Sequence, residues 1–198
     1  NGSNSGQLLI PNANIANPTG SFSLTSWAKL HGIDGVDAIM IAGRLASSSG
    51  YVLEYSESSN RPRVTIGNGT NEHSIMGGSA WQLEEWHYIA MVYDQDNTTL
   101  SLYDNGVFQD STTVTAAFAS IDFQIGADVN GGQAWNGTIS DLVLWNRSLS
   151  AQQILAFSKN RTDLIVSQEL TVGDNWSACV TPNDGSEDGA RVCSSNVT

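Results

Sequence analysis

The chain has 198 residues, of which 40% are hydrophobic and only 14% are charged. Twenty acidic residues outnumber eight basic ones, which gives a net charge of −12 at pH 7. A chain of that charge repels phosphate backbones, so the composition argues against a nucleic-acid partner. No run approaches the roughly 18 apolar residues that a membrane-spanning helix needs, so we expect no membrane-spanning segment.

Hydrophobic residues in the first third of the chain form short runs between turn residues, a pattern typical of strands. We predict strands at residues 7–10, 21–30, 38–42, 51–55 and 63–66. Apolar residues alternate along 21–30, which indicates one buried face. The candidates for that face are Phe22, Leu24, Leu30 and either Trp27 or Ala28.

The most regular pattern lies in the middle of the chain. We predict strands at residues 86–94, 99–104, 107–110, 121–126 and 135–145. Asn105-Gly106 is the signal for a type I′ hairpin turn, because both residues tolerate a positive φ. Strands about ten residues apart with no helices between them indicate a sandwich rather than an alternating α/β sheet.

One short helix is expected near residues 149–158, where Ser148 and Ser150 can cap an apolar segment. Three apolar side chains can share one face of this helix: Leu149, Ile154 and Phe157. The predicted fold class is therefore all-β, a two-sheet antiparallel sandwich with one short helix and a C-terminal β-hairpin.

Several stretches resemble laminin-G-like domains of the concanavalin-A-like jelly-roll group. Residues 86–106 are similar to the family's central strands, and Phe22–Ala28 is similar to its early strand. Residues 125–150 resemble its closing segment, in which a Gly-X-Ile strand leads into an Asn-Arg-X-Leu-Ser turn and the final helix. The resemblance covers about residues 7–160 in the right order. It implies a jelly-roll sandwich.

Residues 161–198 fall outside that pattern, so we divide the chain into a domain at 1–160 and an extension at 161–198. Within the extension we predict strands at 164–166, 170–172 and 176–181, and residues 191–198 would close a hairpin. The stretch from Val172 to Gly185 resembles the late strands of Ig-like modules in archaeal surface proteins. A two-stranded hairpin is marginal alone, so we expect it to pack on its own jelly roll or on a neighbouring chain.

The two cysteines, Cys179 and Cys193, flank a turn-rich segment at residues 182–189. Two strands joined by such a turn would lie opposite each other, so we predict a disulfide between the cysteines. Closing a loop of roughly 15 residues would contribute about 3 kcal/mol in the chain-entropy model. A disulfide implies an oxidising compartment, and we therefore expect an extracellular or cell-surface protein.

Acceptor sites for N-glycosylation, Asn-X-Ser/Thr, are roughly twice as frequent as chance would give in this Ser/Thr/Asn-rich chain. The alternative is that the composition alone creates them. The candidate sites are Asn1, Asn68, Asn97, Asn136, Asn146, Asn160, Asn175 and Asn196. Several of them fall where turns are expected, which favours a glycosylated surface.

Jelly rolls of this group include glucanases, which use paired carboxylates spaced Glu-X-Asp-X-Glu on one strand. The chain has no such triplet. Glu84 and Glu85 are adjacent and would face opposite sides of a strand, and we place Glu54 and Glu57 at a turn. The three histidines are scattered, and no zinc, phosphate-loop or dinucleotide motif occurs. The sequence therefore predicts a protein that is not an enzyme.

Calcium is the one cofactor that the sequence suggests, because hard cations bind several oxygens from loops. The candidate ligands are Asp34, Asp37 and Asp128, the last with Asn130; the alternative is that they are solvated loop acids. A glycan site would need a loop aromatic beside amides. Trp135 with Asn130 fits that description, although Trp135 fits a core position equally well.

Two functions fit these features. The first is a secreted, N-glycosylated structural subunit of an extracellular filament or cell-surface assembly. It would self-associate or bind other surface proteins, because the C-terminal hairpin offers a free strand edge. The second is a lectin-like adhesion module that binds glycans through its loops, with calcium as an aid. The sequence favours the first.

Overall fold

The computed structural model describes residues 7–11, 18–33, 37–46, 48–118, 122–127, 133–161 and 165–198, apart from the side chains of Arg44, Leu45, Ala46 and Gln168. The chain forms two compact units, Asn1–Thr162 and Asp163–Thr198.

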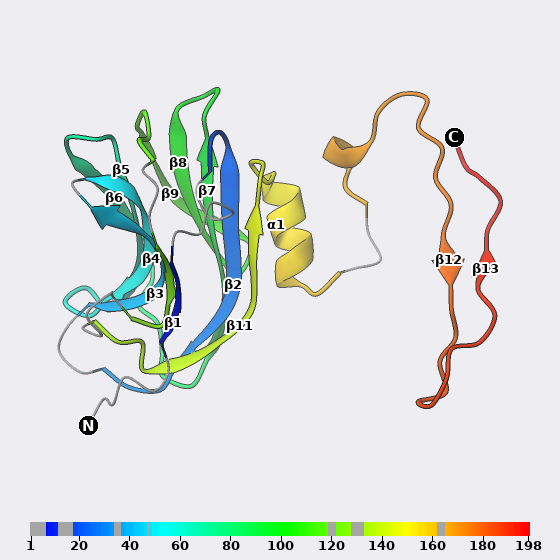
Figure 1. Cartoon of the computed structure of the whole chain (residues 1–198), viewed down its shortest axis with the longest axis horizontal. Helices are drawn as coiled ribbons and strands as arrows, with labels where there is room; N and C mark the ends of the chain where they lie inside the picture. Colours follow the sequence, from blue (N-terminus) through cyan, green and yellow to red (C-terminus); the bar gives the residue numbers. More distant parts are fainter. Residues whose placement is uncertain are drawn as a thin grey trace. The chain divides into compact units, whose positions relative to one another are not determined.

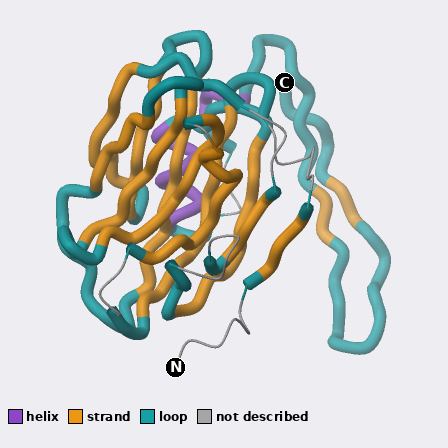
Figure 2. The backbone as a smooth tube through the Cα atoms, turned by 60° about the vertical axis from the view of Figure 1, so that its left-hand side comes forward, coloured by secondary structure: helices purple, strands orange, loops and turns teal. Residues whose placement is uncertain are grey.

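Two antiparallel sheets make up most of the first unit (Figures 1 and 2). The six-stranded sheet runs in the order β1 (Leu8–Ile10), β10 (Phe123–Ile125), β3 (Ala38–Ala46), β4 (Ser49–Ser56), β5 (Arg61–Gly67) and β6 (Glu72–Met76). The five-stranded sheet runs in the order β11 (Gly137–Trp145), β2 (Phe22–Leu30), β7 (Trp86–Asp94), β8 (Thr99–Asp104) and β9 (Val107–Thr113). The all-β jelly-roll prediction is confirmed.

Alternating side chains of both sheets form the principal core between them. From β2 they include Phe22, Leu24, Ala28 and Leu30; from β4, Tyr51, Leu53 and Tyr55; from β7, Ile89, Met91 and Tyr93. A strand has a period of two, so a start at Phe22 places Ala28 in the core and turns Trp27 to the other face. That alternation resolves which of the two residues is buried.

The helix α1 (Ala151–Ser158) packs on the outer face of the five-stranded sheet (Figure 1). Ser150 is its N-cap, and the side chains of Ser150 and Gln153 form a capping box. Leu149 and Ile154 share a hydrophobic cluster with residues of β7. No helix of the described ranges is both long and apolar enough to cross a membrane.

The hairpin between β8 and β9 has the predicted turn. Asn105 has a φ of 53° and Gly106 a φ of 81°, the two positive values of a type I′ turn. The Asn105 side-chain carbonyl accepts the backbone N–H of Tyr88 at 2.9 Å, which ties the turn to β7. A local signal of two residues was therefore sufficient here.

The second unit contains the 3₁₀ turn η2 (Ser167–Glu169) and the paired strands β12 (Cys179–Val180) and β13 (Val192–Cys193). Cys179 lies directly opposite Cys193, and the predicted disulfide joins them. The strands predicted at 164–166 and 170–172 are wrong, because the described residues of both segments lie outside any strand. Instead, the Asp174 carboxylate accepts the backbone N–H of Thr171 at 2.7 Å and so favours a turn.

Candidate functional site

The outer face of the six-stranded sheet, which points away from the core, carries a cluster of polar side chains. Leu53 of β4 and Val64 of β5 are buried in the core. Their neighbours Glu54, Arg63 and Thr65 therefore point to the outer face, because successive side chains of a strand alternate. Glu54 and Arg63 lie opposite each other on the paired strands, so their side chains are adjacent.

Strands on both sides of this pair extend the polar face into a groove of about 330 Å³. Ser74 of β6 lies opposite Thr65, and Gln124 of β10 lies opposite Ala42 of β3. The groove is lined by Ile39, Ala42, Val52, Glu54, Arg63, Thr65, Glu72, Ser74, Gln124 and Gln133. An apolar patch and a polar patch therefore share one concave surface, as in many small-molecule sites.

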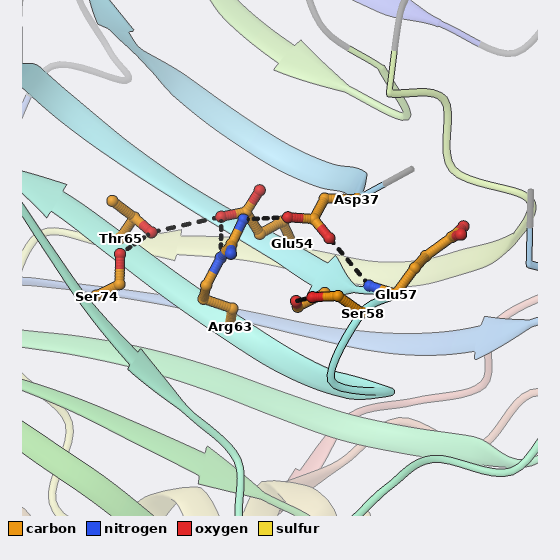
Figure 3. Close-up of polar contacts among 8 residues, drawn as sticks. Asp37, Glu54, Glu57, Ser58, Arg63, Thr65 and Ser74 are labelled. Atoms are coloured by element: carbon orange, nitrogen blue, oxygen red, sulfur yellow. Dashed lines mark hydrogen bonds and ion pairs between the residues drawn. The ribbon is translucent and has the colours of Figure 1, made fainter. Parts of the chain in front are cut away.

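Arg63 lies between two carboxylates (Figure 3). Its Nε donates to Oε1 of Glu54 at 2.7 Å, and its Nη2 donates to Oδ2 of Asp37 at 2.6 Å. Oδ1 of Asp37 also accepts the backbone N–H of Glu57 at 3.0 Å. Burial acts to lower the pKa of Arg63, but the hydrogen bonds and charges of Glu54 and Asp37 outweigh it and raise that pKa. Arg63 is therefore charged and held in place.

Glu54 is only 6% exposed although it lines the groove. Its Oε1 accepts hydrogen bonds from Arg63 and, at 3.4 Å, from the Thr65 hydroxyl, which also contacts the Ser74 hydroxyl at 2.8 Å. The other oxygen of Glu54 takes part in none of the contacts drawn in Figure 3. Because a carboxylate has about four acceptor positions, Glu54 retains capacity for a ligand's hydroxyl or amide groups.

Gln124 is the most deeply buried polar side chain of the groove, at 1% exposed. Among the described residues, neither its Oε1 nor its Nε2 has a hydrogen-bond partner. A buried polar group without a partner costs about 1–3 kcal/mol. Gln124 therefore offers a ligand in the groove one donor and one acceptor that no described residue uses.

The charges of the groove select the kind of ligand it can hold. Glu54 and Glu72 line it and Asp37 lies beside them, whereas Arg63 is the one cation among its lining residues. Carboxylates in excess repel anions and accept hydrogen bonds. The arrangement therefore suits a neutral ligand rich in hydroxyl groups, which would rest its apolar parts on Ile39 and Val52.

A family model described as the concanavalin A-like lectin/glucanases superfamily matches residues 1–155. The chain belongs to this superfamily. The resemblance to laminin-G-like, concanavalin-A-like domains is thereby confirmed. A comparison with proteins of curated function finds no match.

Solved structures of similar fold include a pentraxin and a sialidase module bound to a sugar. A heptameric SAP-like pentraxin from Limulus polyphemus has 17% identity and a TM-score of 0.57, with 72% of this chain and 71% of the pentraxin covered. The CBM40 of the Ruminococcus gnavus IT-sialidase, bound to α2,3-sialyllactose, has 13% identity and a TM-score of 0.62, with 74% and 86% covered. Identities this low concern the fold alone.

A third similar structure is that of botulinum neurotoxin type C, which depends on interaction with two ganglioside molecules to enter cells. It has 16% identity and a TM-score of 0.59. The alignment covers 79% of this chain but only 40% of the toxin chain. The chain thus matches one part of that larger protein.

The predicted calcium ligands of this concanavalin A-like chain are not brought together in the described residues. Asp37 is engaged by Arg63 and by the backbone of Glu57, whereas Asp34 and Asp128 lie outside the described residues. Within the ranges that the structure describes, no group of three His, Cys, Asp or Glu residues could hold a metal ion. Calcium binding stays a prediction.

The predicted glycan-binding tryptophan lies against the core. Trp135 packs on the principal core and meets Trp81 edge-on, with ring centroids 6.5 Å apart. Its indole N–H is buried and has no partner among the described residues. The core alternative for Trp135 thus describes its surroundings better than a loop platform does. Asn130 lies outside the described residues.

The predicted glycosylation sites lie at the surface, except for Asn1, which is outside the described residues. Asn68 is half-buried and the other six are exposed. Two of them also brace turns. The Asn68 side-chain oxygen accepts the backbone N–H groups of Thr70 and Asn71, and the Asn97 Nδ2 donates to Asp94 at 2.8 Å. Glycosylation itself stays a prediction.

Sequence reasoning missed the polar groove and misplaced one of its residues. Glu54 lies inside β4 and not at a turn, because β4 continues to Ser56. A signal was present in the sequence: Glu54 alternates with Leu53 and Tyr55, as a side chain on the outer face of a strand does. Gln124 carried no signal of its own, since it becomes part of the groove only through the pairing of β10 with β3.

Proposed function

We propose that the polar groove binds carbohydrate and that the chain is a non-catalytic glycan-binding module. Gln124 carries this proposal, because a sugar hydroxyl donates and accepts hydrogen bonds and can therefore satisfy both ends of its buried amide. Glu54 and the hydroxyls of Thr65 and Ser74 lie on the same surface for further hydroxyl groups. The sugar ligands of the CBM40 and the neurotoxin support the class of ligand.

The ligand proposed for the groove is a neutral sugar rather than a sialylated or sulfated one. Arg63 is the cation best placed to bind an anionic sugar, but both Glu54 and Asp37 already neutralise it. An additional carboxylate from a ligand would meet Glu54 and Glu72 at close range. Specificity for neutral sugars would thus distinguish this chain from the sialyllactose-bound CBM40.

The test is titration calorimetry of the intact chain with neutral and sialylated oligosaccharides, comparing Gln124→Leu with the unmodified protein. We expect binding of neutral sugars to weaken by roughly tenfold or more, because the hydrogen-bonding amide is lost. Thermal stability should stay equal or rise, since an unpartnered buried amide is replaced by an apolar group of similar size. Gln152→Leu, on the exposed side of α1, is the matched control. Unchanged affinity in Gln124→Leu would refute the proposal.

We further propose that the protein is secreted and N-glycosylated. The disulfide between Cys179 and Cys193 lies in an exposed hairpin, where a reducing cytosol would open it. Exposed acceptor asparagines such as Asn146, Asn160 and Asn196 are open to modification. Intact mass spectrometry of the native protein, before and after enzymatic release of N-glycans, tests this. A native mass equal to that of the bare polypeptide would contradict it.

A role as an assembly subunit is a second candidate, favoured by the exposed apolar side chains of the C-terminal extension, residues 161–198. Val180 and Val192 of its paired strands are 66% and 69% exposed. Contiguous exposed apolar residues mark surfaces that bind another chain. The double variant Val180→Ser with Val192→Ser should remove any self-association that light scattering detects in the unmodified chain. A chain that is monomeric at high concentration would exclude this candidate.

A further inference from the structure

The outer face of the five-stranded sheet is only partly covered by α1. The helix segment packs Leu149 and Ile154 against Tyr88, Ala90 and Val92. At the opposite end of β7, Trp86 is 43% exposed. The same face therefore has one end that is buried by the helix and another that carries an accessible indole.

Strand pairing gathers further side chains around this exposed end. Trp27 of β2 lies opposite both Ser140 of β11 and Tyr88 of β7, and Lys29 lies opposite Trp86. Residues that are opposite on paired strands share a face. Trp27, Trp86, Ser140 and Asp141 line an open groove of about 400 Å³, which we call the aromatic groove.

The aromatic groove is held in shape by contacts within the sheet. The Trp27 ring meets Tyr88 edge-on, with centroids 5.3 Å apart. The Lys29 ammonium lies 5.4 Å from the Trp86 ring centroid and 3.5 Å from the Glu84 carboxylate. Each indole thus already has a packing partner within the sheet, which reduces the ordering that a stacked ligand would require.

A hydrogen-bonding rim accompanies the two indoles. The Ser140 hydroxyl donates to Oδ2 of Asp141 at 3.0 Å, and Asp141 is exposed. A second pocket of about 260 Å³ shares Trp27 and Asp141 and continues to Trp145 and Phe157. The groove thus extends along the sheet past a carboxylate. A flat ring with an apolar face and hydroxyl edges, stacked on an indole, fits these groups.

We propose that the aromatic groove is a second carbohydrate site, which takes a chain of neutral pyranose units. The C–H face of a sugar ring would stack on Trp86 or Trp27, and its hydroxyls would donate to Asp141. Asp141, which lines the groove and is exposed, disfavours an acidic sugar beside it, whereas the charge of Glu84 is balanced by Lys29. Because the polar groove lies on the other sheet of the sandwich, a single module would bridge two glycan chains. The class of ligand rests on the proposed function; the site itself does not.

The decisive experiment measures stoichiometry on the intact, monomeric chain by titration calorimetry. The probes are methyl glycosides of glucose, galactose, mannose and N-acetylglucosamine, together with their tetrasaccharides. We expect two sites per chain, and one site for each of the variants Trp86→Ala and Asp141→Asn. Asn suits position 141, whose φ is 51°. Trp176→Ala, which removes an exposed tryptophan of the second unit, is the matched control and should retain both sites.

The outcomes separate the two sites. Suppose that Trp86→Ala and Asp141→Asn leave stoichiometry and affinity unchanged while Gln124→Leu abolishes all binding. Sugar binding in the aromatic groove is then refuted, and the proposed function of the polar groove stands. If Gln124→Leu changes nothing while Trp86→Ala abolishes binding, sugar binding in the polar groove is refuted and sugar binding in the aromatic groove is supported. Saturable binding of tetramethylammonium that depends on Trp86, with no binding of any sugar, would overturn the carbohydrate assignment.

Bridging has its own readout. The unmodified chain should cluster beads coated with the tetrasaccharide that it binds, whereas Trp86→Ala should bind the same beads without clustering them. Clustering that survives in Trp86→Ala, with the chain still monomeric in light scattering, would overturn the bridging role.

Discussion

The two units of the chain are stabilised in different ways. In the jelly roll, side chains such as Leu53 and Met91 are fully buried between two sheets. In the second unit, none of the described side chains of residues 165–198 is buried. Its paired strands have two residues each and are joined by the bond between Cys179 and Cys193. One unit thus depends on packing, and the other depends on a covalent link and on local turns.

This difference shows where each unit is sensitive to change. Apolar burial contributes roughly 25 cal/mol per Å², so the jelly roll loses stability when volume is removed from its core. A unit without buried side chains has little packing to lose and responds mainly to its cross-link.

The largest effect is expected from Leu53→Ala. Removing this fully buried side chain should lower the free energy of unfolding of the jelly roll by about 3 kcal/mol, because it leaves a cavity between the sheets. Denaturant titration followed by tryptophan fluorescence measures it. The matched change in the other unit, Val180→Ala, should cost under about 0.5 kcal/mol. Equal losses of unfolding free energy in the two variants would show that the second unit depends on packing as much as the jelly roll does.

Removing the cross-link should act on the second unit alone. In the double variant Cys179→Ser with Cys193→Ser, the hairpin should lose about 3 kcal/mol of local stability. Hydrogen exchange at the amides of β12 and β13 should become fast, while the thermal midpoint of the jelly roll stays the same. A lower thermal midpoint for the jelly roll would mean that the second unit contributes to the stability of the first, and the two units would then not be stabilised independently.

A smaller loss is expected from Ser150→Ala. The Ser150 hydroxyl accepts the backbone N–H of Gln153 at 3.2 Å, and a lost N-cap costs about 1 kcal/mol. Denaturant titration of the jelly roll should show this shift. Ser148→Ala is the control, since Ser148 lies outside the capping box. A larger loss of stability in Ser148→Ala than in Ser150→Ala would show that Ser150 is not the residue that caps α1.

The smallest effect concerns pH. The side-chain amide of Asn97, helped by two backbone N–H groups, lowers the pKa of Asp94 in the folded protein. The stabilisation that the ionised Asp94 carboxylate contributes is therefore fully present above the unfolded pKa of about 3.9. It is lost as the pH falls through the lower pKa of the folded protein. Solvent screening keeps it under about 1 kcal/mol. Asp94→Asn should flatten the acid limb of the stability profile, and Asp96→Asn should leave it unchanged.

Local patterns sufficed for the elements that carry their own signal. The predicted bounds of β7 and β8 match those observed, and the Ser150 cap fixes the start of α1. By contrast, β6 was missed because Ile75 is its only buried residue. A strand at the end of a sheet needs few apolar side chains, so its sequence resembles a loop.

The candidate site was harder to predict than the fold. Its residues come from β3, β4, β5, β6 and β10, and they meet only after the sheet has formed. No spacing along the chain connects Gln124 with Glu54. The predicted ligands were loop aromatics and loop acids, whereas both grooves lie on the faces of the sheets.

The two asparagines that brace turns bear on the order of events that the proposed glycosylation would require. In the folded chain, Nδ2 of Asn97 is already bonded to Asp94, and the half-buried amide of Asn68 contacts His73 at 3.0 Å. If these asparagines are glycosylated, the glycan would attach at that same nitrogen, and the transfer would be easiest before the turn closes. Exposed acceptors such as Asn146 impose no such condition. Partial occupancy at Asn68 and Asn97 would then record how quickly these turns form.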